Sequence, residues 1–191
     1  MCSSDLESAV LPVVPMFHVN AWGVPYFAPM VGAKIVFPGP KLDGESLAEL
    51  INNEGVTEAW GVPTVWLGLL GHMRKTEQKF TSLKRVLIGG SAAPRAMMRE
   101  FQEKYGVEGQ QGWGMTETTP LGSVSLIRHK DADLPLDRQF DIKDKQGRAV
   151  FGREMKMVNA VGQALPREGK PFGKPPVRGT ATFCASHYNY N

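Results

Sequence analysis

Residues 110–120 read QQGWGMTETTP, and the rest of the chain is organised around this stretch. It follows the start of a predicted short strand at Val107 and gathers two glycines, an indole, three threonine hydroxyls and one carboxylate before Pro120. Glycine lets a backbone come close to a ligand, and an aromatic face can stack on a planar base. Hydroxyl and carboxylate oxygens suit phosphates and a divalent cation. These residues alone fit a turn that meets a base and phosphates and a polar loop around a buried Trp113 equally well.

Apolar strand patterns alternate with capped helix patterns along the chain before this stretch. Helices are expected after Asp43 as N-cap, with Pro63 in a first turn, and from Pro94 to a stop at Gly106. Such close alternation predicts an α/β fold with a parallel sheet flanked by helices. Strands are expected at Val10–Met16, Lys34–Phe37, Val56–Trp60, Arg85–Ile88 and Val107–Gln111.

Loops that combine glycine with a hydroxyl residue follow the later strands of this series. They are Gly61–Thr64, Gly89–Pro94 and Gln111–Thr119. In parallel sheets, ligands bind beyond the carboxyl ends of the strands. We therefore expect these loops to meet at one site.

The composition excludes several other classes of protein. The chain has 191 residues, 42% hydrophobic residues and a formal net charge of +3. Its scattered basic residues argue against a nucleic-acid partner, and the widely separated Cys2 and Cys184 argue against a disulfide framework or a zinc site. No apolar run reaches transmembrane length, and residues 1–8 lack the pattern of a signal peptide. A reducing, cytoplasmic setting is expected.

The character of the sequence changes after Lys130. Asp131–Arg148 is charged and poor in apolar residues, which predicts a loop. Glu154–Val158 and Gly173–Arg178 are predicted strands, with turns at Asn159–Gln163 and Arg167–Lys170. We expect an α/β portion over residues 1–130, the start of a β-rich subdomain over 131–179, and a divergent tail over 180–191.

Four stretches together carry a family resemblance. They are PMFHVNAWG at 15–23, GVPT at 61–64, GGSAAP at 89–94 and GWGMTE at 112–117. With them the chain resembles the adenylate-forming superfamily, and within it the fatty-acyl-CoA synthetases of medium- and long-chain type. The resemblance runs from about Val10 to Gly179 and implies part of the large N-terminal domain of such an enzyme.

The resemblance implies a role for each matching residue. Thr116, Glu117 and His18 would be catalytic. Thr116 would hydrogen-bond the α-phosphate and the acyl carboxylate, Glu117 would bind Mg²⁺, and His18 would lie where the acyl and nucleotide pockets join. The nucleotide would be bound by Gly89, Gly90, Ser91, Ala92, Ala93, Gln111, Gly112, Trp113, Gly114, Met115 and Thr116. The acyl pocket would be shaped by His18, Trp22, Val62, Thr64 and Trp66.

Simpler interpretations stand beside these roles. A histidine among apolar neighbours, such as His18, is more often a core residue than a catalytic one. Trp22 and Trp66 suit the core of any fold, and Glu117 could be a solvated loop acid.

The implied reaction activates a carboxylate with ATP and transfers the acyl group from AMP to CoA. Its ligands would be ATP or AMP, Mg²⁺, CoA as co-substrate, and a fatty or other medium-length carboxylic acid. The resemblance leaves the acid open between a short thioether acid and other medium-length acids. It is also compatible with a homodimer of the full-length protein.

The sequence departs from the family pattern at several points. No Ser/Thr/Gly-rich phosphate loop ending in Lys precedes Val10, and no ribose-binding Tyr-Arg-Thr-Gly-Asp segment follows Gly179. The C-terminal domain with its catalytic lysine is also missing, and Lys174-Pro175 stands where the family has Glu. We therefore expect an internal piece of a much longer ligase that is inactive alone.

Two other functions remain open from the sequence. A luciferase-type oxygenase uses the same scaffold, and light emission with a luciferin would identify it. The other is a non-catalytic remnant that binds nucleotide or acyl ligands, or the product of a broken gene with no activity, and titration of the purified chain with nucleotide would distinguish it from an enzyme.

Overall fold

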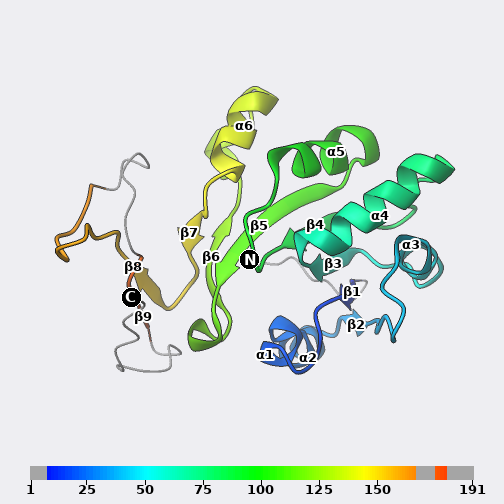
Figure 1. Ribbon diagram of the computed structural model, residues 1–191, viewed down its shortest axis with the longest axis horizontal. Coiled ribbons are helices and arrows are strands. Elements are labelled where there is room, and N and C mark those ends of the chain that lie inside the picture. Colours follow the sequence, from blue (N-terminus) through cyan, green and yellow to red (C-terminus); the bar gives the residue numbers. More distant parts are fainter. Residues whose placement is uncertain (1–7, 167–174, 180–191) are drawn as a thin grey trace.

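The computed structural model describes residues 8–166 and 175–179, which form an α/β fold (Figure 1). A seven-stranded sheet has the order β2-β1-β3-β4-β5-β6-β7. The pairs from β2 to β5 are parallel, and β6 and β7 extend the sheet antiparallel beyond β5. The predicted sheet flanked by helices is confirmed. Its strands are β1 (Ala9–Pro12), β2 (Lys34–Ile35), β3 (Glu58–Gly61), β4 (Arg85–Ile88), β5 (Glu108–Gly114), β6 (Leu121–Ser125) and β7 (Arg148–Ala149).

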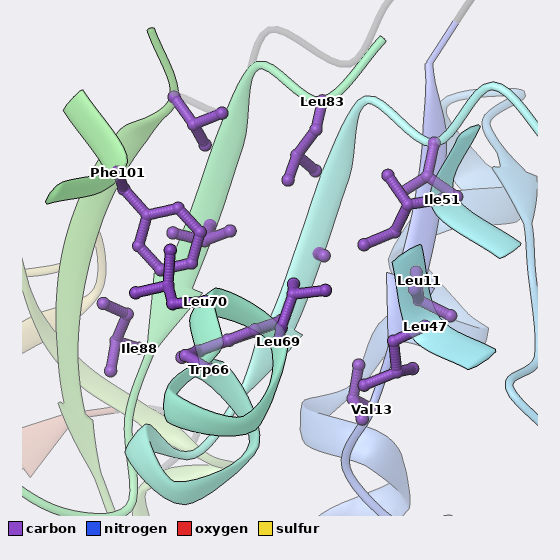
Figure 2. Packing of buried hydrophobic residues seen from close by; sticks show 14 of the residues in the cluster. Leu11, Val13, Leu47, Ile51, Trp66, Leu69, Leu70, Leu83, Ile88 and Phe101 are labelled. Atoms are coloured by element: carbon purple, nitrogen blue, oxygen red, sulfur yellow. The ribbon is translucent and has the colours of Figure 1, made fainter. Parts of the chain in front are cut away.

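Each face of the sheet carries its own apolar layer, because side chains alternate along a strand. On β1, Leu11 belongs to the larger layer and Val10 to the smaller. The larger layer is covered by α3 (Gly44–Asn53), α4 (Pro63–Thr76) and α5 (Arg95–Tyr105), and the smaller by α2 (Val24–Met30). Figure 2 shows the centre of the larger layer, where Trp66 and Phe101 pack with the leucines of α4.

The helix boundaries follow the expected capping residues. The Asp43 carboxylate accepts a hydrogen bond of 2.9 Å from the Ser46 N–H, which holds the pKa of Asp43 below its usual value. Pro63 is the first residue of α4, and Pro94 is the N-cap of α5. Gly106 ends α5 with a φ of 68°, as a C-terminal glycine does.

The loop expected over Asp131–Arg148 is wrong, because the segment contains α6 (Leu136–Lys143). The Phe140 ring is fully buried in the larger layer. Arg95 of α5 donates to Asp141 at 2.8 Å and to Asp144 at 2.7 Å. The charges that suggested a loop are thus the partners of a neighbouring helix. Burial also lowers the pKa of Lys143, while Glu108 acts in the opposite direction.

The strands around residues 110–120, called the signature stretch below, also differ from expectation. Residues 111–114 continue β5 and are not a loop, and β6 and β7 were not predicted. The strand expected at Val10–Met16 ends at Pro12.

The predicted β structure near the C-terminal end is present as an antiparallel pair, β8 (Arg153–Met155) with β9 (Val177–Gly179). Asn159 donates its N–H to the Gln163 carbonyl at 3.0 Å, which confirms the turn expected there. The turn at Arg167–Lys170, the start of the strand at Gly173 and the tail 180–191 lie outside the described residues. The boundaries expected between the α/β portion, the β-rich subdomain and the tail stay predictions.

No helix within the described ranges is long and apolar enough to cross a membrane.

Phe140→Ala is expected to lower the free energy of unfolding by about 3–5 kcal/mol, because it leaves a cavity where a buried ring stood. Urea denaturation followed by circular dichroism measures this change. Phe151→Ala is the matched control, since the Phe151 ring is fully exposed and its removal is expected to change stability by less than about 0.5 kcal/mol. Equal stability of the two variants would contradict the packing of α6 on the core.

Candidate functional site

A cavity of about 780 Å³ lies beside the carboxyl ends of β4 and β5. One wall comes from the segment around α1 (Val19–Trp22) and α2, and the opposite wall from residues 112–117 and 119–121. Between them the lining comes from Trp60 and Leu87 of the sheet. Gly89 and Gly90 line it from the loop after β4 (Gly89–Pro94, the β4 loop). The predicted site residues that the cavity brings together are His18, Trp22, Gly89, Gly90, Gly112, Trp113, Gly114, Met115, Thr116 and Glu117.

The α1 wall has an unusual backbone. All residues from Val19 to Trp22 have left-handed φ angles, between 47° and 55°. This conformation costs roughly 1–2 kcal/mol per non-glycine residue, and a β-branched residue such as Val19 is rare there. The turn sets the Trp22 indole against the β4 loop: a Cβ on residue 89 would lie 2.9 Å from Trp22 Cη2. Glycine at 89 therefore leaves the space that the indole occupies.

The aromatic lining continues from α2 onto the sheet. The Phe27 and Trp60 rings stack with centroids 4.9 Å apart. Tyr26 and Met30 line the same cavity and are more than half exposed. These residues were missed from the sequence. The sequence pointed to the site only through Trp60, which ends a predicted strand. The contact between α2 and β3 joins segments far apart in the sequence, so local patterns do not reveal it.

The signature stretch forms a compact turn after β5. Residues 116–118 make a single 3-10 turn. The buried Thr118 hydroxyl accepts the Met115 N–H at 2.9 Å and lies within hydrogen-bond distance of the Met115 and Pro120 carbonyls. Thr118 thus holds the turn from inside, while Thr116 and Glu117 line the cavity.

The Trp113 indole packs against β6. A Cβ on residue 122 would lie 2.5 Å from Trp113 Cζ3, so the indole edge rests against the backbone of Gly122. Gly122 was not among the expected site residues, because β6 itself was not predicted. Trp113 also lines the cavity, so a large aromatic group borders it.

Gln111 and Ala93 lie behind the cavity wall and connect β5 with the β4 loop. Gln111 is 1% exposed, and its Oε1 accepts the Ala93 N–H at 2.7 Å. Its buried Nε2 has no hydrogen-bond partner within the described part of the chain. Ser91 and Ala92 are exposed and outside the cavity lining.

Val62, Thr64 and Trp66, which were expected to shape the acyl pocket, are not part of the cavity lining. Val62 supports Gly90, since a Cβ on residue 90 would lie 3.0 Å from Val62 Cγ1. Thr64 is exposed, and it is not part of the lining. Trp66 is fully buried in the larger core layer, where its Nε1–H donates to the Gly61 carbonyl at 3.2 Å. Its position on the opposite face of the sheet from α2 is that of a core residue.

The charge available to a metal ion is small. Glu117 is half-buried and is the carboxylate among the described residues that line the cavity. Within residues 8–166 and 175–179, no group of three or more His, Cys, Asp or Glu side chains could hold a metal ion. A cation here would therefore need oxygen ligands from a bound molecule, which is how Mg²⁺ is commonly held with one carboxylate and phosphates.

Comparison with known proteins identifies relatives of this chain. It is 50% identical over 170 residues to the 3-methylmercaptopropionyl-CoA ligase of Ruegeria lacuscaerulensis, over 89% of this chain and 32% of that protein. It is 51% identical over 173 residues to the medium-chain-fatty-acid–CoA ligase of Ectopseudomonas oleovorans, over 91% of this chain and 32% of that protein. The chain thus spans about a third of the length of these curated relatives.

A solved structure has the same fold. The crystal structure of a long-chain-fatty-acid-CoA ligase from Archaeoglobus fulgidus matches with a TM-score of 0.76 at 23% identity, over 94% of this chain and 35% of that chain. The family model described as AMP-binding enzyme matches residues 2–184. The resemblance to acyl-CoA synthetases is confirmed, and this chain belongs to the family of AMP-binding enzymes.

Proposed function

We propose that this chain provides the acyl-adenylate site of an ATP-dependent fatty-acid–CoA ligase. One observation carries the proposal: a single cavity joins an aromatic, apolar wall to a glycine-rich turn that presents Thr116 and Glu117. The apolar wall suits an alkyl chain, and the turn suits a phosphate. A carboxylic acid whose head meets a nucleotide is the ligand that needs both.

The reaction has two balanced steps. A carboxylate oxygen of the acid attacks the α-phosphorus of ATP, and pyrophosphate leaves with the electrons of the broken P–O bond. The CoA thiolate then attacks the acyl carbonyl, and AMP leaves. Negative charge gathers on phosphate oxygens in the first step, so donors held in place before reaction lower the barrier.

The chain's own residues fit the first step. The Thr116 hydroxyl would donate to an α-phosphate oxygen, and the Trp113 indole would lie against the adenine. His18 is exposed where it lines the cavity, and its place beside the Trp22 wall suits the junction of acid and nucleotide. Glu117 would hold Mg²⁺ together with ATP phosphates, where the ion would neutralise phosphate charge.

The acid would lie along the aromatic wall. Trp22, Phe27 and Trp60 give this part of the cavity an apolar lining, which favours a medium-length alkyl or thioether chain. Two relatives with about half of their aligned residues identical are named 3-methylmercaptopropionyl-CoA ligase and medium-chain-fatty-acid–CoA ligase, which supports this class.

The remaining properties of the protein are proposed from the same assignment. CoA is the acyl acceptor, the setting is cytoplasmic, and the full-length protein is compatible with a homodimer and has no nucleic-acid partner. Residues 131–179 would begin the β-rich subdomain, and their described part contains α6, β7 and the separate antiparallel pair β8–β9.

Mg²⁺ is expected to tighten ATP binding to the wild-type chain, and Glu117→Gln is expected to reduce that gain at least about tenfold, because the neutral amide is a poor ligand for Mg²⁺. Isothermal titration with ATP, with and without MgCl₂, measures the difference. Glu77→Gln, at the end of α4 and away from the cavity, is the control. An equal response to Mg²⁺ in Glu117→Gln and wild type would contradict the metal role.

Lengthening the acyl chain of a non-hydrolysable acyl-adenylate, such as an acyl-sulfamoyl adenosine, is expected to tighten binding about fourfold per methylene, from about 0.8 kcal/mol of transfer free energy. The gain should stop once the cavity is filled. Titrations with acetyl, butanoyl, hexanoyl, octanoyl and decanoyl analogues give the series. An affinity independent of chain length would contradict an acyl role for the aromatic wall.

The 191 residues purified by themselves are expected to release no pyrophosphate from ATP and decanoate, because they span about a third of the length of the curated relatives. A coupled pyrophosphate assay against a boiled sample tests this. Pyrophosphate release well above that of the boiled sample would show that these 191 residues suffice for adenylation.

A further inference from the structure

Arg153 connects the β8–β9 pair to the turn at residues 115–120, which is called the signature turn below. Its Nη2 donates to the Thr118 carbonyl and, at 2.7 Å, to Thr119 Oγ1. Arg153 is the first residue of β8, whereas Thr118 ends the 3-10 turn that carries Glu117. The two bonds join residues that are 35 and 34 positions apart in the sequence.

The turn is held by different groups on its two sides. On the inside, the Thr118 hydroxyl binds the backbone at Met115 and Pro120. On the outside, the guanidinium of Arg153 binds the carbonyl of the same residue. Thr119 has a left-handed φ of 51°, so the chain reverses at this point in a conformation that a non-glycine residue adopts only when its surroundings hold it.

The chemistry of arginine suits this contact. A hydrogen bond from a charged donor is roughly twice as strong as one between neutral groups. A planar guanidinium can also meet a carbonyl and a hydroxyl at once in a fixed geometry, which the compact ammonium of lysine does less well. Arg153 itself is half-buried, so water screens it only in part.

We propose that Arg153 is a positioning residue that fixes the turn carrying Thr116 and Glu117, so that the arrangement of the β8–β9 pair controls the geometry of the nucleotide site. This inference rests on the proposed function, since it assigns Thr116 and Glu117 to ATP and Mg²⁺. Arg153 touches no reacting atom. It acts on the site through the backbone of Thr118 and the side chain of Thr119.

Amide hydrogen exchange of the ¹⁵N-labelled full chain tests the contact directly. The N–H groups of Met115, Thr118 and Thr119 are bonded within the turn, so they exchange faster when the turn opens. Arg153→Ala is expected to accelerate their exchange about tenfold, and Arg153→Lys, which keeps the charge, is expected to restore part of the protection. Arg178→Ala, at an exposed position on β9, is the matched control and is expected to leave the three rates unchanged.

The amides of Val86 and Ile88 in β4 serve as an internal reference for global opening. Faster exchange at the turn with unchanged rates in β4 supports the proposal. Unchanged exchange rates at the turn in Arg153→Ala would overturn it, because the contact would then not hold the turn. Equal acceleration in the turn and in β4 would also overturn it, because the contact would then stabilise the fold as a whole.

AMP titration of the same samples separates this inference from the proposed function. Arg153→Ala is expected to weaken AMP binding about tenfold relative to wild type and Arg178→Ala. If the wild-type chain binds no AMP, the nucleotide role assigned to this chain fails, while the exchange rates still decide whether Arg153 holds the turn.

Discussion

The parallel pairing of β3, β4 and β5 is the constraint on which the site depends. It brings the β4 loop and the signature turn to one edge of the sheet, although more than twenty residues separate them in the chain. Parallel strands must be connected by crossovers, and α4 and α5 are those crossovers here. The same helices bury the larger face of the sheet, so the packing that stabilises the fold also holds the strand ends in place.

The face of the sheet with the smaller apolar layer borders the cavity. Val24 and Ala28 of α2 belong to its apolar layer, Trp22 of α1 packs against that layer, and residues of both helices line the cavity. Val10, Trp60 and Leu87 point to this face because they alternate with residues of the larger core. The alternation of side chains along each strand therefore sends some apolar residues to the larger core layer and the others to the face near the cavity.

Sequence reasoning succeeded where local chemistry decides the structure. Arg85–Ile88 was placed to the residue, and Asp43 and Gly106 act as caps because capping depends on neighbours within one helical turn. It failed where distant partners decide. Only the fold explains α6, whose single phenylalanine is buried against the core and whose acids meet α5.

The site residues divide in the same way. Motif residues with a backbone role, such as Gly89, and those of the signature turn lie at the cavity. Trp66 lies in the core, which is the alternative that the sequence offered beside the acyl pocket, and its spacing with Leu69, Leu70 and Met73 is the pattern of a buried helix face. Tyr26 and Phe27 could not have been assigned to the cavity, because the relation between α2 and the sheet is set by the left-handed turn at 19–22.

The closeness of two glycines to indoles has a consequence for anyone who wishes to redesign substrate preference. A single methyl group on residue 89 or 122 would collide with Trp22 or Trp113, so both positions shape the cavity by having no side chain. A combinatorial library should leave them untouched. Diversity belongs at Tyr26 and Met30, whose exposed side chains can change size without moving the main chain.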